Sequence, residues 1–319
     1  MRIDQELAQS SPGQDTVLTI GVFDGVHLGH LELIAHLIRE GKDTGHVTVV
    51  VTFRSHPASV LRPDFKPRYL TSLDERISLI RQTGVEFVVP ITFDRDLSRL
   101  SARDFVVRLQ RHLGMRGLVV GPDFALGHKR QGDVETLTTL GGELGFSVRV
   151  VDLAKDNGQA IKSTTIREAL AAGDVTAAAT LLGRNFVLTG VVVEGVGRGK
   201  TLGFPTANVK VQADIAIPGD GIYAAWARLG NSCHMAAVSI GTRPTFEESG
   251  HTVEAFILDF EGDLYGQEVR LEFVRRLRDE VKYDTVQALQ EQVEKDVDET
   301  RAILQSSRAK PGKPTKLAI

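Results

Sequence analysis

The spacing of apolar segments most strongly constrains the fold of this chain, because short apolar runs alternate with longer amphipathic stretches in its first half. The apolar runs cover residues 16–22, 47–53, 87–91, 117–120 and 147–151. The amphipathic stretches cover residues 28–40, 73–82, 102–113 and 133–143. Short, almost wholly apolar strands separated by helices are typical of a parallel sheet covered on both faces. We therefore predict a doubly wound α/β domain, which binds ligands at the carboxyl ends of its strands.

The pattern changes near Gly183, after an alanine-rich helical stretch at 164–182. The β-rich segments that follow are separated by Gly, Pro and Asp, and they cover 186–194, 222–229, 234–240, 252–259 and 268–274. No helical crossover fits between them, which favours an antiparallel barrel or sandwich. A helix at 284–303 closes the chain. We place one domain at 1–182, a β-barrel domain at 183–305 and a basic flexible tail at 306–319.

Composition excludes several classes of protein. A length of 319 residues suits two domains, and the net charge of −3 gives no sign of a nucleic-acid partner. A nucleic-acid-binding arm in the basic tail is the alternative. No apolar run is long enough to span a membrane. The single cysteine, Cys233, cannot form an internal disulfide, so we predict a cytoplasmic protein. A homo-oligomer stays open.

The most distinctive motif is IGVFDGVHLGH at residues 20–30, where a strand turns into a helix. His27 and His30 are three residues apart, so both imidazoles share one helix face. The helix N-terminus adds free N–H groups and partial positive charge, which bind anions. Gly29 allows a ligand to approach the backbone closely. The motif therefore predicts a triphosphate site; two surface histidines beside a turn are the alternative.

The string G-x-F-D-G-x-H-x-G-H resembles the signature of the nucleotidyltransferase superfamily. This resemblance implies an ATP site that includes His27, His30, Gly29 and the turn residues Gly21, Phe23, Asp24 and Gly25. A second superfamily element is expected late in the domain, where Ser163, Thr164 and Arg167 stand in KSTTIR. Ser and Thr suit a helix cap and Arg suits a phosphate. A simple helix cap is the alternative for this segment.

The whole first half is similar to the N-terminal half of the bacterial bifunctional riboflavin kinase/FMN adenylyltransferase (FAD synthetase) family. The matching segments are GVFDGVHLGH, VTFRSHP at 51–57, LTSLDERISLI at 70–80, VVGPDFALGHKRQGD at 119–133 and STTIREAL at 163–170. The resemblance implies that Asp123 and Phe124 contribute to the flavin site. A buried Asp-Phe turn is the alternative. Lys162 stands where this family usually has Ser, which leaves the role of that position open.

The second half carries GFPTAN at 203–208, which resembles the riboflavin kinase motif. The resemblance implies that Gly203 and Pro205 help to bind ATP, and that Thr206 and Asn208 hold its phosphates and Mg²⁺. Hydroxyl and amide oxygens suit such a hard cation. Without the Pro-Thr-Ala-Asn string, the glycines of this segment would fit a plain turn.

The segments GDGIYAAWA at 219–227 and VEAFILDFEGDLYGQEV at 253–269 extend the resemblance through the second half. By resemblance, Glu254 is the base that takes the proton of the riboflavin 5′-hydroxyl, and Arg278 lies near the flavin. A carboxylate suits that role if it lies within hydrogen-bond reach. By residue chemistry alone, Glu254 would be one outward residue of an alternating strand and Arg278 a solvated charge.

Three residues depart from the usual pattern of this family: Phe256 stands for His, Ser239 for Asn and Asn185 for Pro. The resemblance implies an ATP- and Mg²⁺-dependent enzyme that converts riboflavin to FMN and FMN to FAD at two separate sites. An adenylyltransferase with an impaired kinase half is the nearest alternative. A flavin-sensing regulator without catalysis, or another cytidylyl- or adenylyltransferase, are further alternatives.

Overall fold

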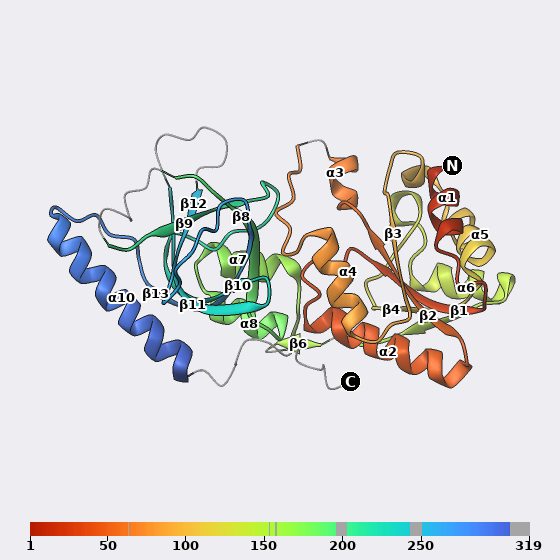
Figure 1. The fold of residues 1–319 in the computed structure, drawn as a ribbon. Helices are drawn as coiled ribbons and strands as arrows, with labels where there is room; N and C mark the ends of the chain where they lie inside the picture. Colours follow the sequence, from red (N-terminus) through yellow and green to blue (C-terminus); the bar gives the residue numbers. More distant parts are fainter. Residues whose placement is uncertain (63, 153, 157, 196–202, 243–250, 307–319) are drawn as a thin grey trace. The chain divides into compact units, whose positions relative to one another are not determined.

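The structure of the protein is a computed structural model that describes residues 1–62, 64–152, 154–156, 158–195, 203–242 and 251–306. The basic tail expected at 306–319 lies outside the described residues, apart from Ser306. The chain forms two compact units, which divide between Ser163 and Thr164. Each unit has a sheet of its own (Figure 1). No helix of the described segments is long and apolar enough to cross a membrane.

The first unit contains a five-stranded parallel sheet with strand order β3-β2-β1-β4-β5, which confirms the predicted α/β class. Its strands are β1 (Thr16–Gly21), β2 (Val47–Phe53), β3 (Phe87–Ile91), β4 (Met115–Val120) and β5 (Ser147–Val150). The strand order reverses between β1 and β4. In sheets of this type, ligands bind in the crevice beyond the carboxyl ends of the strands at such a reversal.

Helices cover both faces of this sheet (Figure 1). On one face, α2 (Leu28–Thr44) and α4 (Leu73–Gln82) contribute buried residues such as Ile34, Leu37 and Ile80 to one apolar core. On the other face, α5 (Ala102–Leu113) and α6 (Val134–Leu144) contribute to a second core. Short elements complete the unit: α3 (Pro57–Leu61), the 3-10 turns Leu97–Arg99 and His128–Arg130, and the hairpin of β6 (Lys155–Asp156) and β7 (Gln159–Ala160).

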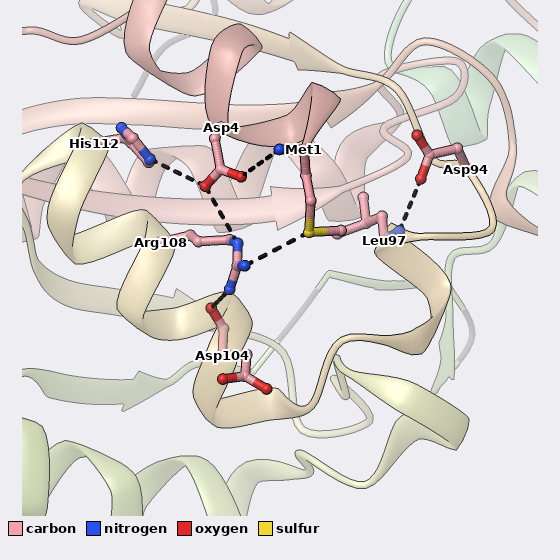
Figure 2. Close-up of polar contacts among 7 residues, drawn as sticks. All are labelled: Met1, Asp4, Asp94, Leu97, Asp104, Arg108 and His112. Carbon is pink, nitrogen blue, oxygen red and sulfur yellow. Dashed lines mark hydrogen bonds and ion pairs between the residues drawn. The ribbon is translucent and has the colours of Figure 1, made fainter.

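The sequence pattern did not predict the N-terminal helix α1 (Arg2–Gln9), which packs on α5. Figure 2 shows the polar contacts that attach its beginning. The Asp4 carboxylate pairs with the Met1 amine at 3.1 Å, the Arg108 guanidinium at 3.3 Å and the His112 imidazole at 3.2 Å. Arg108 also donates to the carbonyl of Asp104 at 2.9 Å. These pairs are partly exposed, so each adds only a fraction of a kcal/mol to stability, up to about 1.

The second unit confirms the predicted antiparallel barrel, which is closed and has the strand order β10-β11-β12-β9-β8-β13. Its strands are β8 (Phe186–Val193), β9 (Thr206–Val211), β10 (Gly221–Leu229), β11 (Ser232–Thr242), β12 (His251–Ile257) and β13 (Glu268–Arg278). The helix α10 (Val286–Ser306) follows the barrel and contacts β10, β11 and β13. Strand β9 was not expected, and it carries Thr206 and Asn208 of the GFPTAN motif.

The helical stretch predicted at 164–182 forms two helices, α7 (Ser163–Ala171) and α8 (Val175–Leu182). Gly173 takes the left-handed conformation, with φ 76°, and Asp174 then caps α8 by accepting from the Ala177 N–H at 2.8 Å. Helix α8 packs on β8 and β13, where it buries Leu181 and Leu182. The second compact unit therefore begins at Thr164, whereas the domain limits predicted from sequence assign both helices to the first domain.

Candidate functional site

The turn after β1 has an unusual backbone. Phe23 and Val26 have positive φ values of 54° and 40°, and Gly25 between them has 80°. A β-branched residue such as Val26 rarely adopts this conformation, which stores strain of about 1–3 kcal/mol per residue and clusters at functional sites. Surrounding contacts must therefore hold the turn in place.

Asp24 supplies part of that hold. Its side chain is buried, and one carboxylate oxygen accepts from the backbone N–H groups of Leu70 at 2.9 Å and Thr71 at 3.3 Å. The Thr71 hydroxyl accepts in turn from the Gly25 N–H at 3.2 Å. The motif placed Asp24 at the ATP site. Its hydrogen bonds show that its side chain stabilises the turn.

The two histidines of the motif lie together at the N-terminus of α2. His27 is the N-cap residue, and its Nδ1 accepts from the His30 backbone N–H at 3.4 Å. The imidazoles stack with 3.6 Å between ring centroids and 18° between planes. A Cβ on Gly29 would lie 3.3 Å from the His27 ring. The glycine therefore leaves room for this imidazole, a reason that the sequence had not indicated.

Beside these histidines is a cavity of about 310 Å³ at the carboxyl ends of β1 and β4. It lies at the strand-order reversal, where this fold binds ligands. Its lining includes the predicted site residues Gly21, Phe23, His30, Asp123 and Phe124, together with Ile20, Leu33, Gly121, Pro122, Asp152 and Ala160. Sequence reasoning missed Asp152, although it follows strand β5 closely and so lies at the same edge of the sheet.

The loop that carries Asp123 and Phe124 is held by its own contacts. The Phe124 N–H donates to the Gly121 carbonyl at 3.2 Å, and the Arg130 guanidinium donates to the Asp123 carbonyl at 2.9 Å. The Phe124 ring packs against the core beneath the sheet. The Asp123 carbonyl therefore accepts from Arg130, and Asp123 and Phe124 both line the cavity.

A wider hollow of about 580 Å³ lies elsewhere, along helix α4. It is lined by Asp74, Ile77, Ser78, Arg81 and Gln82, all from this one helix, and by none of the predicted site residues. A single helix does not enclose a ligand, so we assign the site to the smaller cavity.

The segment after the hairpin reaches the same turn. The Ser163 hydroxyl donates to the Asp24 carbonyl at 2.9 Å, which places this serine, the last residue of the first unit, beside the His27 turn. Lys162, the departure from the family pattern, is exposed. Thr164 and Arg167 follow on α7 in the second compact unit, and their role at the ATP site stays a prediction.

In the barrel, Glu254 lies on β12 directly opposite Asn208 of β9 and Ser239 of β11. Its neighbours Val253 and Ala255 are buried inside the barrel, so Glu254 points to the outer face, where it is half-buried. The Thr206 hydroxyl donates to the Glu254 carboxylate at 3.2 Å. The structure thus brings Thr206, Asn208 and Glu254 together on one outer wall.

The surroundings of these residues explain several glycines and departures. A Cβ on Gly195 would lie 2.0 Å from the Asn208 amide, so a larger residue there would displace the Asn208 side chain. Gly203 has a left-handed φ of 85°.

Phe256, which replaces the usual His, packs edge-on against Phe204 with 5.5 Å between ring centroids. Asn185, which replaces the usual Pro, donates to the Glu272 carboxylate at 2.9 Å.

Arg278 has partners within the protein. Its guanidinium donates two hydrogen bonds to the Asp296 carboxylate of α10, at 2.9 and 2.6 Å, and a third to the Asp279 carbonyl at 2.8 Å. The bond to Asp296 raises the pKa of Arg278. The Asp296 side chain is only 6 % exposed, so the pair fixes α10 to the end of β13. The flavin contact of Arg278 stays a prediction.

Comparisons with known proteins agree on both halves. Residues 9–165 match the family model described as FAD synthetase, and residues 182–304 match the one described as riboflavin kinase. Bifunctional riboflavin kinase/FMN adenylyltransferases are similar over most of the chain. The protein from Escherichia coli K12 is 35% identical over 288 residues, covering 90% of this chain and 92% of its own. The protein from Bacillus subtilis 168 is 34% identical over 289 residues, covering 89% and 91%.

Among solved structures, a crystal structure from Streptococcus pneumoniae has a TM-score of 0.86 and 30% identity, covering 92% of this chain and 96% of its own. That protein is described as a macrolide-efflux protein, which disagrees with the names of the sequence relatives. We take the fold from this likeness and the activity from the family models and the curated relatives, which agree with each other.

The parallel sheet with its histidine turn, followed by a closed barrel with a PTAN strand, defines an ATP-dependent transferase with two domains. The chain belongs to the bifunctional riboflavin kinase/FMN adenylyltransferase family. Its reactions are the phosphorylation of riboflavin to FMN and the adenylylation of FMN to FAD.

Proposed function

We propose that adenylyl transfer takes place in the cavity at the ends of β1 and β4, with His27 and His30 bound to the triphosphate of ATP. The observation that carries this proposal is the stacked imidazole pair at the N-terminus of α2. A phosphate oxygen of FMN attacks the α-phosphorus of ATP, and pyrophosphate leaves with the electrons of the broken bond. Imidazole N–H donors and the helix N-terminus stabilise the charge that develops on these phosphates.

Other residues of this site take supporting roles. Gly21, Phe23 and Gly25 shape the turn, and Asp24 holds it through the backbone of residues 70–71. We assign the flavin to the side of the cavity lined by Asp123 and Phe124, because it offers an aromatic surface beside a polar group. Ser163, which donates to the Asp24 carbonyl, lies beside the phosphates, and the assignment of Thr164 and Arg167 to ATP rests on the family resemblance alone.

We propose that phosphorylation takes place on the outer wall of the barrel, with Glu254 as the general base. Its carboxylate takes the proton of the riboflavin 5′-hydroxyl, whose oxygen attacks the γ-phosphorus of ATP, and ADP leaves. The Thr206 hydroxyl, 3.2 Å from the carboxylate, orients it. Gly203 and Pro205 lead the chain into this strand, and Arg278 binds the flavin ring from the end of β13.

The donor set of this wall fits Mg²⁺. Thr206 offers a hydroxyl oxygen, Asn208 an amide oxygen and Glu254 a carboxylate, and hard cations prefer such oxygens. Among the described residues no cluster of three His, Cys, Asp or Glu side chains is placed to hold a metal. Thr206 and Asn208 would therefore hold the ion together with ATP phosphates. When bound, Mg²⁺ neutralises charge on the transferred phosphoryl group.

The alternative of an impaired kinase half depended on Phe256 and Ser239. Phe256 packs on Phe204 of the motif and leaves Glu254 beside Thr206. This contact favours two working sites over an adenylyltransferase with an inactive barrel, and over a regulator that does not catalyse. We further propose a cytoplasmic enzyme with small-molecule substrates and no nucleic-acid partner, on the strength of the single Cys233 and the net charge of −3.

A product assay with either riboflavin or FMN as substrate tests whether the two reactions take place at separate sites. Purified enzyme receives ATP and Mg²⁺ with either riboflavin or FMN, and FMN and FAD are separated by chromatography. We expect Asn208→Ala to lose FMN formation from riboflavin and to keep FAD formation from supplied FMN. We expect Arg167→Ala to show the reverse. If both variants lose the same reaction, the assignment of two separate sites is wrong.

A further inference from the structure

Helix α4 carries a buried arginine that the proposed chemistry does not use. Arg76 is only 1% exposed and is one of the largest fully buried side chains. Its Nη1 donates to the Val22 carbonyl at 2.6 Å and to the Phe53 carbonyl at 3.0 Å. Phe53 is the last residue of β2, and Val22 follows β1 directly. The guanidinium therefore joins the carboxyl ends of the two neighbouring strands.

Burial of this group costs free energy that two hydrogen bonds offset only in part. Burial lowers the pKa of Arg76, which the charges of Asp24 and Tyr69 counteract. The Nε–H is buried and has no hydrogen-bond partner in the part of the chain that the structure describes. A buried charge that is incompletely satisfied destabilises a fold, and apolar residues of similar volume often stabilise it better. Stability alone therefore does not account for an arginine here.

The position of Arg76 beneath the strained turn offers a reason. Val22 is followed at once by Phe23, whose φ is 54°, and Val26 of the same turn has φ 40°. Such conformations persist only where surrounding contacts over-determine them. The Val22 carbonyl accepts from both Arg76 and the Thr52 hydroxyl, the latter at 3.0 Å. These donors fix the carbonyl from which the turn starts.

We infer that Arg76 is a positioning residue for adenylyl transfer. By holding the Val22 carbonyl, its guanidinium fixes the turn that delivers His27 to the N-terminus of α2. This inference rests on the proposed function of the histidine site. A shift of about 1 Å in a catalytic group costs as much as 10²-fold in rate. Loss of the guanidinium should therefore slow the chemical step while the sheet below stays folded.

The test compares Arg76→Met, Arg76→Lys and the control Arg81→Met, which removes an exposed charge from the same helix. Enzyme in excess over FMN is mixed with ATP and Mg²⁺, and FAD formation is followed through one turnover. We expect Arg76→Met to lower the rate constant about 10- to 100-fold with a parental amplitude. Arg76→Lys should stay within a few-fold of the parent, because one Nζ can replace the single nitrogen that makes both bonds. Riboflavin phosphorylation serves as an internal control in every variant.

Hydrogen exchange separates positioning from folding. The Gly25 N–H donates to Thr71 and the Val26 N–H donates to the Phe23 carbonyl, so both amides report on the turn. We expect Arg76→Met to lose protection at these two amides and to keep it in β2. An unchanged rate constant would overturn the inference. A lower amplitude with a parental rate constant, or loss of β2 protection in both the Met and the Lys variants, would also overturn it, because Arg76 would then serve folding.

His27→Ala is measured in parallel, so that failure of the two proposals can be told apart. If His27→Ala keeps the parental rate constant, the proposed histidine site is wrong. If His27→Ala is slow and Arg76→Met is not, the histidine site stands and only the positioning role of Arg76 fails.

Discussion

Replacement of Glu254 by glutamine is the sharpest test of the kinase site. Glutamine has the size and shape of glutamate. In the parent the Thr206 hydroxyl donates to the Glu254 carboxylate at 3.2 Å, and the amide oxygen of glutamine can accept the same hydrogen bond. The side chain is half-buried on the outer wall, so neither the barrel core nor the fold should be disturbed. The substitution removes one property only, the ability to accept a proton near neutral pH.

The size of the loss follows from that single property. Positioned acid–base catalysis contributes about 10²–10⁴ in rate, or about 3–5 kcal/mol in activation free energy. We expect phosphorylation to fall by this factor while riboflavin and ATP still bind, because the lost interaction belongs to the transition state. A rival account attributes phosphoryl transfer to positioning alone, since its transition state is loose. That account predicts only a modest loss.

Steady-state rates of both reactions, measured on one preparation, decide between the two accounts. FMN supplied from outside should become FAD at the parental rate, because that reaction belongs to the first unit. Kinase activity close to that of the parent would refute the assignment of Glu254 as the base. Loss of both activities together would instead indicate misfolding, which circular dichroism of the same sample would reveal.

Three further outcomes are expected. Substitution of either His27 or His30 by alanine should lower FMN adenylylation about 10²–10³-fold and leave riboflavin phosphorylation intact, and a loss of only a few-fold would contradict the triphosphate site. A fragment of residues 184–319, without the first domain, should still phosphorylate riboflavin. A longer fragment of residues 164–319 should melt at a higher temperature, because it keeps α8 packed on the barrel. Equal melting temperatures of the two fragments would argue against that packing. Asp296→Asn should lower the free energy of unfolding by about 1.5–3 kcal/mol in a urea titration, and an unchanged midpoint would show that its charge-assisted hydrogen bonds are dispensable.

The fold could be predicted from sequence where periodicity was strong. The apolar run at 47–53 coincides with β2, and the stretch at 102–113 coincides with α5. Strand β9 was not predicted, because it begins directly after Pro205 in a segment rich in turn residues. Its pairing with β8 and β12 also depends on closure of the barrel. Helix α1 was not predicted, because its two buried side chains, Ile3 and Leu7, are too few to show a helical period of apolar residues.

The candidate site was predictable where its residues are neighbours in the chain. His27 and His30 share one helical turn, so their spacing alone predicts that they lie together. Arg76 contacts Val22, which is 54 residues earlier, and only the folded sheet brings this pair together. For Arg278, sequence resemblance suggested a flavin contact, which stays a prediction, but it gave no sign of the bond to Asp296, because that bond forms only where α10 packs on the barrel.

The closed barrel has a consequence for how this enzyme can change over time. Along β12, the side chains of Val253 and Ala255 face the interior, and Glu254 between them faces the outer wall. Substitutions at the interior positions change the packing of the barrel, whereas substitutions at the outer positions change the proposed phosphoryl-transfer wall, so stability and activity depend on alternating residues of one strand. A library that randomises only the interior positions of the barrel therefore samples heat resistance with the phosphoryl-transfer residues held constant.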